Sequence, residues 1–311
     1  MKESLFPAKI LLFGEYVILK NSSGLSIPHN IYKGTLKVPS NSGLDKNILY
    51  SNSEIKKFHN FLSIYARKKK CISTKLDLKK LHEDIQKGIF FHSNIPQGYG
   101  VGSSGALVAA IYDKYAKNKL NKCFKKQNII ILKKIFSQME SFFHGKSSGI
   151  DPLICYLNQP LFIRSETDIS IIGIPKKNTG KGAIFLLNSG IPSKTNSMIK
   201  LFLKKLKHDS FKTILIEFIK YNEKCIEAFL KEDFNILLKN VKLLSNWVFH
   251  HFSPMISKDF LKIWEYGIFN NIYYLKLCGS GGGGFFLGFT SNYDLSKKKL
   301  KKYTMEVLFR F

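Results

Sequence analysis

Arginine is scarce in this 311-residue sequence, although the chain is strongly basic. Only three arginines accompany 46 lysines, and the 49 basic residues against 22 acidic ones give a formal net charge of +27. Arginine is the usual reader of bases and phosphates because its planar fork binds bidentately. The lysines are spread along the chain in runs of no more than three. The pattern therefore favours a solvated lysine coat over a specific nucleic-acid surface.

Cysteine and long apolar runs are scarce as well. The five cysteines are an odd number, and no two form a CxxC pair, which argues against a zinc site or a disulfide framework. No segment approaches the ~18 uncharged apolar residues of a spanning helix. Lys9 and Glu15 interrupt the apolar N-terminal stretch, so it lacks the core of a secretory signal. We therefore expect a cytoplasmic protein with no membrane partner.

Apolar residues recur at both helix and strand spacings, which predicts an α+β protein of two domains. Helices are expected over residues 56–67, 76–86, 105–115, 124–144, 197–206, 212–230, 233–249 and 257–268. Strands are expected over residues 8–19 (with a turn at Gly14), 24–38, 161–174, 183–187, 273–277 and 285–289. The loop Pro175–Gly182 is rich in Pro, Lys, Asn and Gly, which favours a domain limit near Thr179. The predicted domains are therefore residues 1–179 and 180–311.

The segment Pro96–Ala106, with the sequence PQGYGVGSSGA, is the most informative part of the chain. Its alternating glycines let the backbone approach a ligand closely, and the helix that follows adds unpaired N–H donors and a positive dipole end. The segment therefore predicts a phosphate cradle, with an ordinary turn and a serine-capped helix as the alternative. It is not a GxxxxGK[ST] loop, because no lysine follows the glycines, and it fits a dinucleotide fingerprint poorly.

The glycine run Gly281–Gly284 is the second unusual feature. Four glycines lose much conformational entropy on folding. The run therefore predicts a close approach of its backbone to something bulky, a flexible hairpin between the strands at 273–277 and 285–289, or both.

Three segments together resemble the signatures of the GHMP kinases, the superfamily of galactokinase, homoserine kinase, mevalonate kinase and phosphomevalonate kinase. Pro7–Tyr16 looks like the first motif, Pro96–Ala106 like the second and Lys276–Gly284 like the third. Glu140–Asp151 is similar to the Glu…His-Gly-x-Pro-Ser-Gly-x-Asp element of mevalonate kinases, and Ser189–Thr195 resembles their segment ending in a substrate-side threonine. The resemblance implies an N-terminal domain like the second domain of ribosomal protein S5 and a ferredoxin-like C-terminal domain.

The resemblance also implies roles for individual residues. Asp151 would be the catalytic base, with Lys9 beside it. Asp151 comes after a glycine-containing turn and not within the helix expected over residues 124–144. Ser104 and Glu140 would be the Mg²⁺ ligands. The residues implied to bind ATP are Pro96, Gly98, Tyr99, Gly100, Val101, Gly102, Ser103, Ser104, Gly105 and Ala106. The residues implied to bind the second substrate are Glu15, Tyr16, Thr195 and Gly281.

The candidate catalytic and metal residues also have ordinary structural interpretations. Lys9 is one of many lysines, which are mostly solvated. Glu140 is compatible with an exposed helix position paired with His144, and Asp151 with a turn or a helix cap.

Four positions depart from the family pattern. Tyr16 stands where many mevalonate kinases have His, Ser147 replaces the usual Pro, and Gly105 and Ser280 replace common alanines. The expected activity is ATP-dependent phosphorylation of the 5-hydroxyl of mevalonate by a monomer or homodimer. The alternatives are another GHMP kinase such as phosphomevalonate kinase, a mevalonate-diphosphate decarboxylase, or a nucleic-acid-binding protein on a kinase fold.

Overall fold

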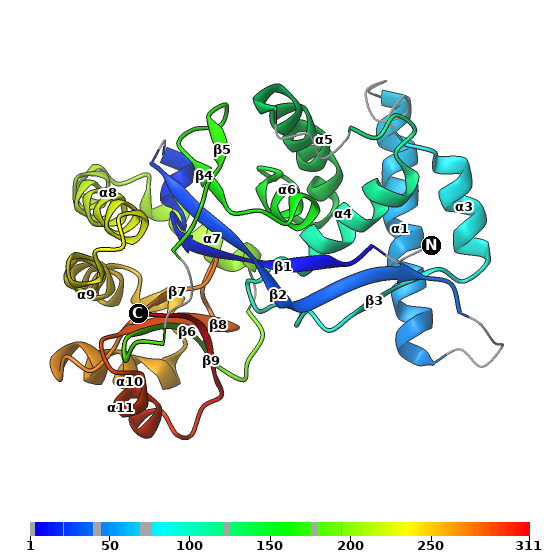
Figure 1. Cartoon of the computed structure of the whole chain (residues 1–311). Coiled ribbons are helices and arrows are strands. Elements are labelled where there is room, and N and C mark those ends of the chain that lie inside the picture. The colour runs from blue at the N-terminus through cyan, green and yellow to red at the C-terminus, as the bar shows by residue number, and fades with distance from the viewer. Residues whose placement is uncertain are drawn as a thin grey trace. The chain divides into compact units, whose positions relative to one another are not determined.

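The computed structural model describes residues 4–20, 22–39, 45–68, 76–120, 125–175, 179–193 and 195–311 (Figure 1). The chain divides into two compact units. Unit 1 comprises Met1–Lys9, Pro28–Pro96 and Gly102–Gln159, and unit 2 comprises Ile10–Ile27, Gln97–Val101 and Pro160–Phe311. The units interleave along the chain, whereas the predicted limit near Thr179 is a single cut in the sequence. That limit stays a prediction.

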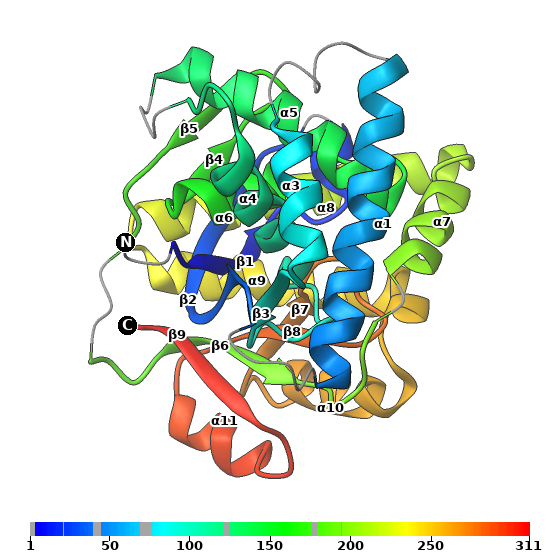
Figure 2. The same cartoon turned by 90° about the vertical axis from the view of Figure 1, so that its right-hand side faces the viewer.

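Unit 1 combines strands with five helices among its described residues. Strand β1 (Phe6–Phe13) begins in this unit and lies beside β2 (Gly24–Lys37), whose C-terminal part pairs antiparallel with β3 (Phe90–Ser93). The helices are α1 (Lys46–Lys68), α3 (Leu78–Gln86), α4 (Ser103–Tyr115), α5 (Lys126–His144) and α6 (Ile150–Leu157). Helix α4 packs against α5 and α6, and α1 packs along α3, as Figure 2 shows for the last pair.

The almost wholly apolar sequence of α4 fits this position, because most of its residues from Gly105 to Tyr115 are buried. A helix that is apolar on all sides needs neighbours on all sides. The N-terminus of α4 follows the glycine loop directly, so the packed helix fixes the place where that loop ends.

Unit 2 contains a four-stranded antiparallel sheet in the order β7-β8-β6-β9. Its strands are β6 (Ala183–Asn188), β7 (Tyr274–Leu277), β8 (Phe285–Thr290) and β9 (Met305–Arg310). Its helices are α7 (Thr195–Lys205), α8 (Asp209–Leu230), α9 (Phe234–His251), α10 (Lys258–Phe269) and α11 (Tyr293–Lys299). Helices α9 and α10 pack on β7, and α8 packs along α9 (Figure 1). The start of β2 pairs with β4 (Leu161–Ile163), which pairs with β5 (Ile169–Ile171).

The structure confirms the α+β class and most of the predicted elements, but several details of the prediction are wrong. Residues 17–20 form a 3₁₀ helix, η1 (Val17–Lys20), instead of a strand. The predicted strand over 161–174 is two short strands, and α1 begins ten residues before the expected residue 56. The sequence prediction missed α6, α11, β3 and β9. Phe124, expected to begin a helix, lies outside the described residues.

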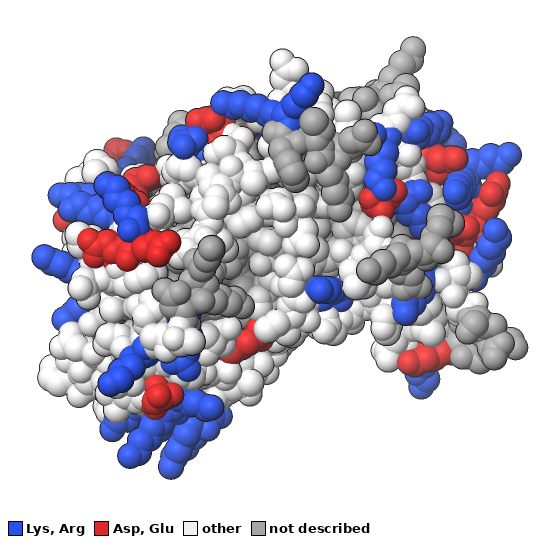
Figure 3. All heavy atoms as spheres, in the orientation of Figure 1, with Lys and Arg blue, Asp and Glu red and all other residues white. Residues whose placement is uncertain are grey.

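The basic residues are dispersed over the face shown in Figure 3. Lysines gather at the end of α11, whose last turn contains Lys297, Lys298 and Lys299. Elsewhere on this face, basic side chains stand among acidic ones. None of the described helices is long and apolar enough to cross a membrane. The dispersed charge is what a lysine coat predicts.

Candidate active site

Asp151 lies in the first turn of α6, after the glycine-containing connection that follows α5 and not within α5 itself, as expected. The helix begins after Gly149, which adopts a left-handed backbone conformation with φ 75°. Pro152 fits the first turn because its missing N–H would have no partner there. An aspartate in a first turn is stabilised by the helix dipole. The glycine turn and the proline together place the Asp151 carboxylate at the beginning of α6.

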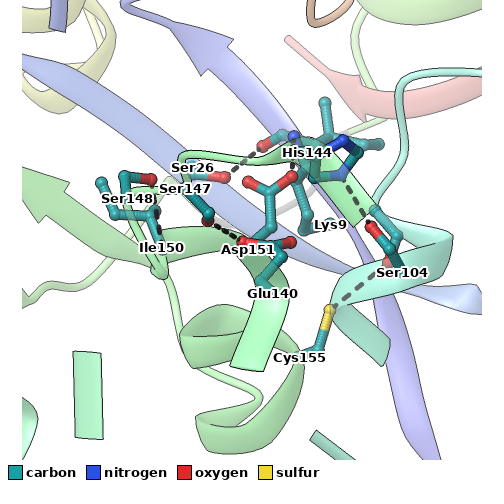
Figure 4. Close-up of polar contacts among 12 residues, drawn as sticks. Lys9, Ser26, Ser104, Glu140, His144, Ser147, Ser148, Ile150, Asp151 and Cys155 are labelled. Carbon is teal, nitrogen blue, oxygen red and sulfur yellow. Dashed lines mark hydrogen bonds and ion pairs between the residues drawn. The ribbon is translucent and has the colours of Figure 1, made fainter. Parts of the chain in front are cut away.

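Lys9 reaches this carboxylate from β1. Its Nζ lies 3.0 Å from Oδ2 of Asp151, and the Lys9 side chain is 6% exposed while that of Asp151 is 36% exposed (Figure 4). A buried ammonium group requires a nearby anion or hydrogen-bond acceptor, so the interpretation of Lys9 as a surface charge is wrong. The unequal exposure keeps part of the carboxylate open to a reactant.

Glu140 lies on α5 and is buried, with 3% of its surface exposed. It accepts a hydrogen bond from the hydroxyl of Ser147 (Figure 4). Burial and the negative charge of Asp151 raise the pKa of Glu140 to about 8, against the opposing effects of Ser147 and Lys9. The alternative of a solvated Glu140 paired with His144 is therefore wrong. His144 instead places its Nε2 3.2 Å from the Ser104 hydroxyl oxygen.

Ser147 occupies a tight connection between α5 and α6. The Ser137 hydroxyl donates to the Ser147 carbonyl at 2.6 Å, and the Gly149 N–H donates to the Ser147 hydroxyl at 3.0 Å. The backbone and side chain of Ser147 are thus both fixed while its own hydroxyl donates to Glu140. In the sequence, Ser147 stands out only as a departure from the proline of the mevalonate kinase element. The preference of serine for hydrogen-bonded turns was the signal that pointed to this contact.

Gly105 explains how closely α4 and α6 approach each other. A Cβ built on Gly105 would stand 2.9 Å from both the carbonyl carbon of Asp151 and the nitrogen of Pro152. A side chain at position 105 would therefore displace the first turn of α6. The small residue sets the distance between the serine-bearing end of α4 and the carboxylate of Asp151.

In unit 2, the glycine run packs on the middle of the predicted phosphate loop. A Cβ on Gly100 would stand 2.3 Å from the Cys278 carbonyl oxygen, and a Cβ on Gly284 would stand 2.6 Å from the Tyr99 Cα. The Phe285 N–H donates to the Tyr99 carbonyl at 3.3 Å. Close backbone approach therefore accounts for these glycines, and the approach is to another stretch of backbone. The run also joins the antiparallel strands β7 and β8, so it is a hairpin connection as well, but one that hydrogen bonds to Met255 and Ile191 hold in place.

Glu15 and Tyr16 also lie in unit 2. The Lys276 ammonium group lies 2.8 Å from Oε2 of Glu15, and both side chains are almost fully buried. Burial raises the pKa of Glu15, while Lys276 opposes that effect. The other carboxylate oxygen of Glu15, Oε1, is buried without a hydrogen-bond partner among the described residues. The Tyr16 hydroxyl donates to the Ser280 carbonyl.

The predicted site residues thus fall into two groups. Unit 1 brings together Lys9, Glu140 and Asp151, with Ser104 joined to His144 at the start of α4. Unit 2 holds Glu15, Tyr16, Gly281 and the loop residues Gly98 to Val101, while Pro96 and the residues from Gly102 to Ala106 belong to unit 1. Thr195 begins α7, and its side chain lies outside the described residues.

The donor set in unit 1 fits a magnesium ion. No group of three or more His, Cys, Asp or Glu residues suited to a metal occurs among the residues described here. Mg²⁺, however, usually binds one or two carboxylates together with substrate phosphates and water. Glu140 and Asp151 supply carboxylates whose mutual repulsion a divalent cation would offset, and Ser104 supplies a hydroxyl. These residues suit Mg²⁺ bound together with a phosphate ligand.

Residues 67–159, which include the glycine loop, Glu140 and Asp151, match the family model of the GHMP kinases N terminal domain. This segment therefore carries the pattern of a GHMP kinase N-terminal domain. A search of curated protein sequences finds no match. The structural comparisons extend the likeness to a GHMP kinase fold over nearly the whole chain.

A mevalonate kinase and a phosphomevalonate kinase are similar in structure to this protein. The L. major mevalonate kinase in complex with R-mevalonate has a TM-score of 0.65 and 16% identity, covering 99% of this chain and 97% of that one. The Streptococcus pneumoniae phosphomevalonate kinase in complex with phosphomevalonate and AMPPNP has a TM-score of 0.64 and 12% identity, covering 99% and 100%.

A sugar kinase is similar as well. The Lactococcus lactis galactokinase complexed with galactose has a TM-score of 0.62 and 12% identity, covering 97% of this chain and 92% of that one. At these identities the likeness establishes the fold alone, and the GHMP fold accepts several alcohols.

Proposed function

We propose that this GHMP protein is a mevalonate kinase, which transfers the γ-phosphoryl group of ATP to the 5-hydroxyl of mevalonate. The observation that carries the proposal is the contact between Lys9 and a partly exposed Asp151, with the buried Glu140 close enough to have its pKa raised by Asp151. Cytoplasmic location and a monomeric or homodimeric state belong to the same proposal.

In this proposal the chain's own residues accept a proton from the substrate and bind the phosphate groups. Asp151 accepts the proton of the attacking hydroxyl, whose oxygen forms a bond to the γ-phosphorus as the bond from that phosphorus to the ADP oxygen breaks. Lys9 holds the Asp151 carboxylate in one orientation through their ion pair at 3.0 Å. The free N–H groups at the start of α4 donate to phosphate oxygens. Glu140 and Ser104 would hold Mg²⁺, which supplies charge neutralisation at the phosphates.

The substrate assignment is supported by two observations. The Glu140–Asp151 element is similar to that of mevalonate kinases, and one similar structure contains R-mevalonate. The resemblance also assigns Glu15 to the substrate side, but its carboxylate is buried against Lys276. Tyr16, Thr195 and Gly281 are carried over as substrate-side residues by the resemblance.

Phosphomevalonate kinase is the second candidate, because the TM-score to that enzyme from S. pneumoniae, 0.64, nearly equals the TM-score to the mevalonate kinase of L. major. A phosphorylated substrate would need further cations in its pocket, and a chain with 46 lysines supplies them readily. Fold likeness does not separate the two candidates.

The direct test is ADP release by the purified protein with ATP, Mg²⁺ and a panel of acceptors. The panel contains mevalonate, phosphomevalonate, homoserine and galactose. We expect ADP release with mevalonate. Release with another acceptor and none with mevalonate would refute the substrate assignment and leave the kinase assignment intact. The absence of release with every acceptor would contradict both.

A further inference from the structure

Tyr16 has an unusual backbone conformation for a large side chain. Its φ is +66°, and the Val17 N–H donates to the Glu15 carbonyl at 2.8 Å across it. This three-residue turn with positive φ is a rare γ-turn. Residues that keep such a conformation are held in it by their surroundings and cluster at functional sites. The turn therefore calls for a role that depends on where it points the Tyr16 side chain.

The Tyr16 ring is buried in an aromatic cluster of unit 2. Its centroid lies 4.6 Å from that of Phe202 and 5.3 Å from that of Phe252, and the residue is 8% exposed. The hydroxyl at the far end of the ring donates to the backbone carbonyl of Ser280. Packing and hydrogen bonding together thus fix the side chain along its whole length.

Ser280 belongs to the third-motif loop, which we define as Gly279–Gly284. This loop has other hydrogen bonds in unit 2: the Gly282 N–H donates to the Met255 carbonyl at 2.6 Å, and the Gly284 N–H donates to the Ile191 carbonyl at 2.6 Å. The Ser193 hydroxyl donates to the Gly281 carbonyl. The loop is therefore fixed from several sides, and Tyr16 is its contact with the first motif.

The beginning of the third-motif loop lies against the middle of the glycine loop. A Cβ on Gly279 would stand 3.4 Å from the Gly100 Cα. A Cβ on Gly100 would stand only 2.3 Å from the Cys278 carbonyl oxygen. A displacement of Ser280 would therefore change the packing surface of Gly100. The buried pair of Glu15 and Lys276, 2.8 Å apart, connects the same two motifs one residue before Tyr16.

We infer that Tyr16 is a positioning residue for the ATP phosphates: its hydroxyl holds the third-motif loop in place, and that loop supports residues 97–101 of the glycine loop. The inference rests on the proposed function, in that residues 97–101 bind ATP. It assigns the Tyr16 hydroxyl to Ser280, whereas the family resemblance assigns Tyr16 to the second substrate. The two roles differ in which reactant loses affinity when the hydroxyl is removed.

The variant that separates the roles is Tyr16→Phe, which removes the hydroxyl and keeps the aromatic packing. Affinity for a non-hydrolysable ATP analogue is measured by titration without any alcohol present. We expect it to fall about threefold to tenfold, the range for one lost hydrogen bond, and the KM for ATP to rise in parallel. The KM for the alcohol should stay within about twofold. Tyr274→Phe is the matched control. Among the described hydrogen bonds, the Tyr274 hydroxyl makes one, an exposed bond that it donates to the Asn271 side chain at 3.3 Å.

A second measurement follows the loop directly. Amide hydrogen exchange at Gly282 and Gly284, whose N–H groups are hydrogen-bonded, should become faster in Tyr16→Phe and remain unchanged in Tyr274→Phe. Unchanged exchange and unchanged analogue affinity in a folded Tyr16→Phe protein would overturn the inference. A rise in the KM of the alcohol alone would also overturn it, in favour of a substrate ligand. Failure of every alcohol in the ADP-release panel would refute the proposed function without affecting the titration.

Discussion

The first motif contributes Lys9 to unit 1 and Glu15 to unit 2. The ion pairs that these two residues form differ in their exposure to solvent. Lys9 pairs with Asp151 at 3.0 Å, with Asp151 36% exposed, whereas Glu15 pairs with Lys276 at 2.8 Å, with both side chains at 2% exposure or less. Lys9 and Glu15 lie only six positions apart in the chain. The two ion pairs have similar distances between their charged atoms and differ in how deeply their side chains are buried.

The difference shows what each pair is able to do. A carboxylate that keeps a third of its surface open is able to receive a proton from a reactant. A fully buried pair keeps its charges away from water, and its Coulomb attraction is offset by the desolvation of both groups. The pair in unit 1 is therefore suited to chemistry, and the pair in unit 2 to holding the first and third motifs together.

The largest expected effect tests the chemical role of the accessible pair. Asp151→Asn removes the proton acceptor and keeps the shape, so kcat should fall about 10²- to 10⁴-fold. The measurement is the steady-state rate of ADP release with the acceptor found in the panel. Asp209→Asn is a matched control, because Asp209 pairs with Lys212 on the surface of α8. Near-normal turnover in Asp151→Asn would exclude Asp151 as the base.

The next effect tests the structural role of the buried pair. Lys276→Met leaves the Glu15 carboxylate buried without its cation, which should lower the free energy of unfolding by about 3–5 kcal/mol. Lys9→Met should cost about 1 kcal/mol or less, because its partner is partly solvated. Urea denaturation of both variants gives the comparison. Equal losses would mean that the difference in exposure does not distinguish the pairs.

The pH dependence of stability sharpens the comparison further, through Glu140. Its folded pKa of about 8 exceeds the ordinary value of 4.5, so the folded state binds more protons than the unfolded state between these values. This contribution to stability is complete below about pH 4.5 and is lost as pH rises through about 8, by roughly a few kcal/mol. Without divalent cations, unfolding of Glu140→Gln should therefore show a flatter profile over this range. Parallel profiles for the variant and the unchanged chain would contradict the raised pKa.

A smaller effect tests the hydrogen bond that Ser147 donates to Glu140. Ser147→Ala should weaken Mn²⁺ binding, measured by electron paramagnetic resonance with a non-hydrolysable ATP analogue, by about threefold to tenfold. Ser148→Ala is the matched control, because the Ser148 hydroxyl accepts from the Ile150 N–H at 3.3 Å. A loss of the same size in both variants would indicate a general effect on the turn.

The sequence predicted what depends on local pattern and on motifs. The apolar run of α4, the amphipathic helices of unit 2 and the positions of Lys9, Glu140 and Asp151 all followed from spacing or resemblance. The partner of Glu15 lies 261 residues away, and no local rule couples positions that far apart. The η1 turn was missed because Val17 and Ile18 favour strands, whereas the left-handed Tyr16 and its distant contact with Ser280 impose a turn.

The contact of Gly105 with the start of α6 limits how this protein can be engineered. The motif that this segment resembles commonly has alanine at this position, and alanine usually stabilises a helix by about 1 kcal/mol relative to glycine. A designer following the family consensus would therefore restore it. Here the added methyl group would meet backbone atoms of Asp151 and Pro152 at 2.9 Å. Alanine at position 105 would therefore require a matching change in the first turn of α6, and the expected gain in helix stability would be lost without it.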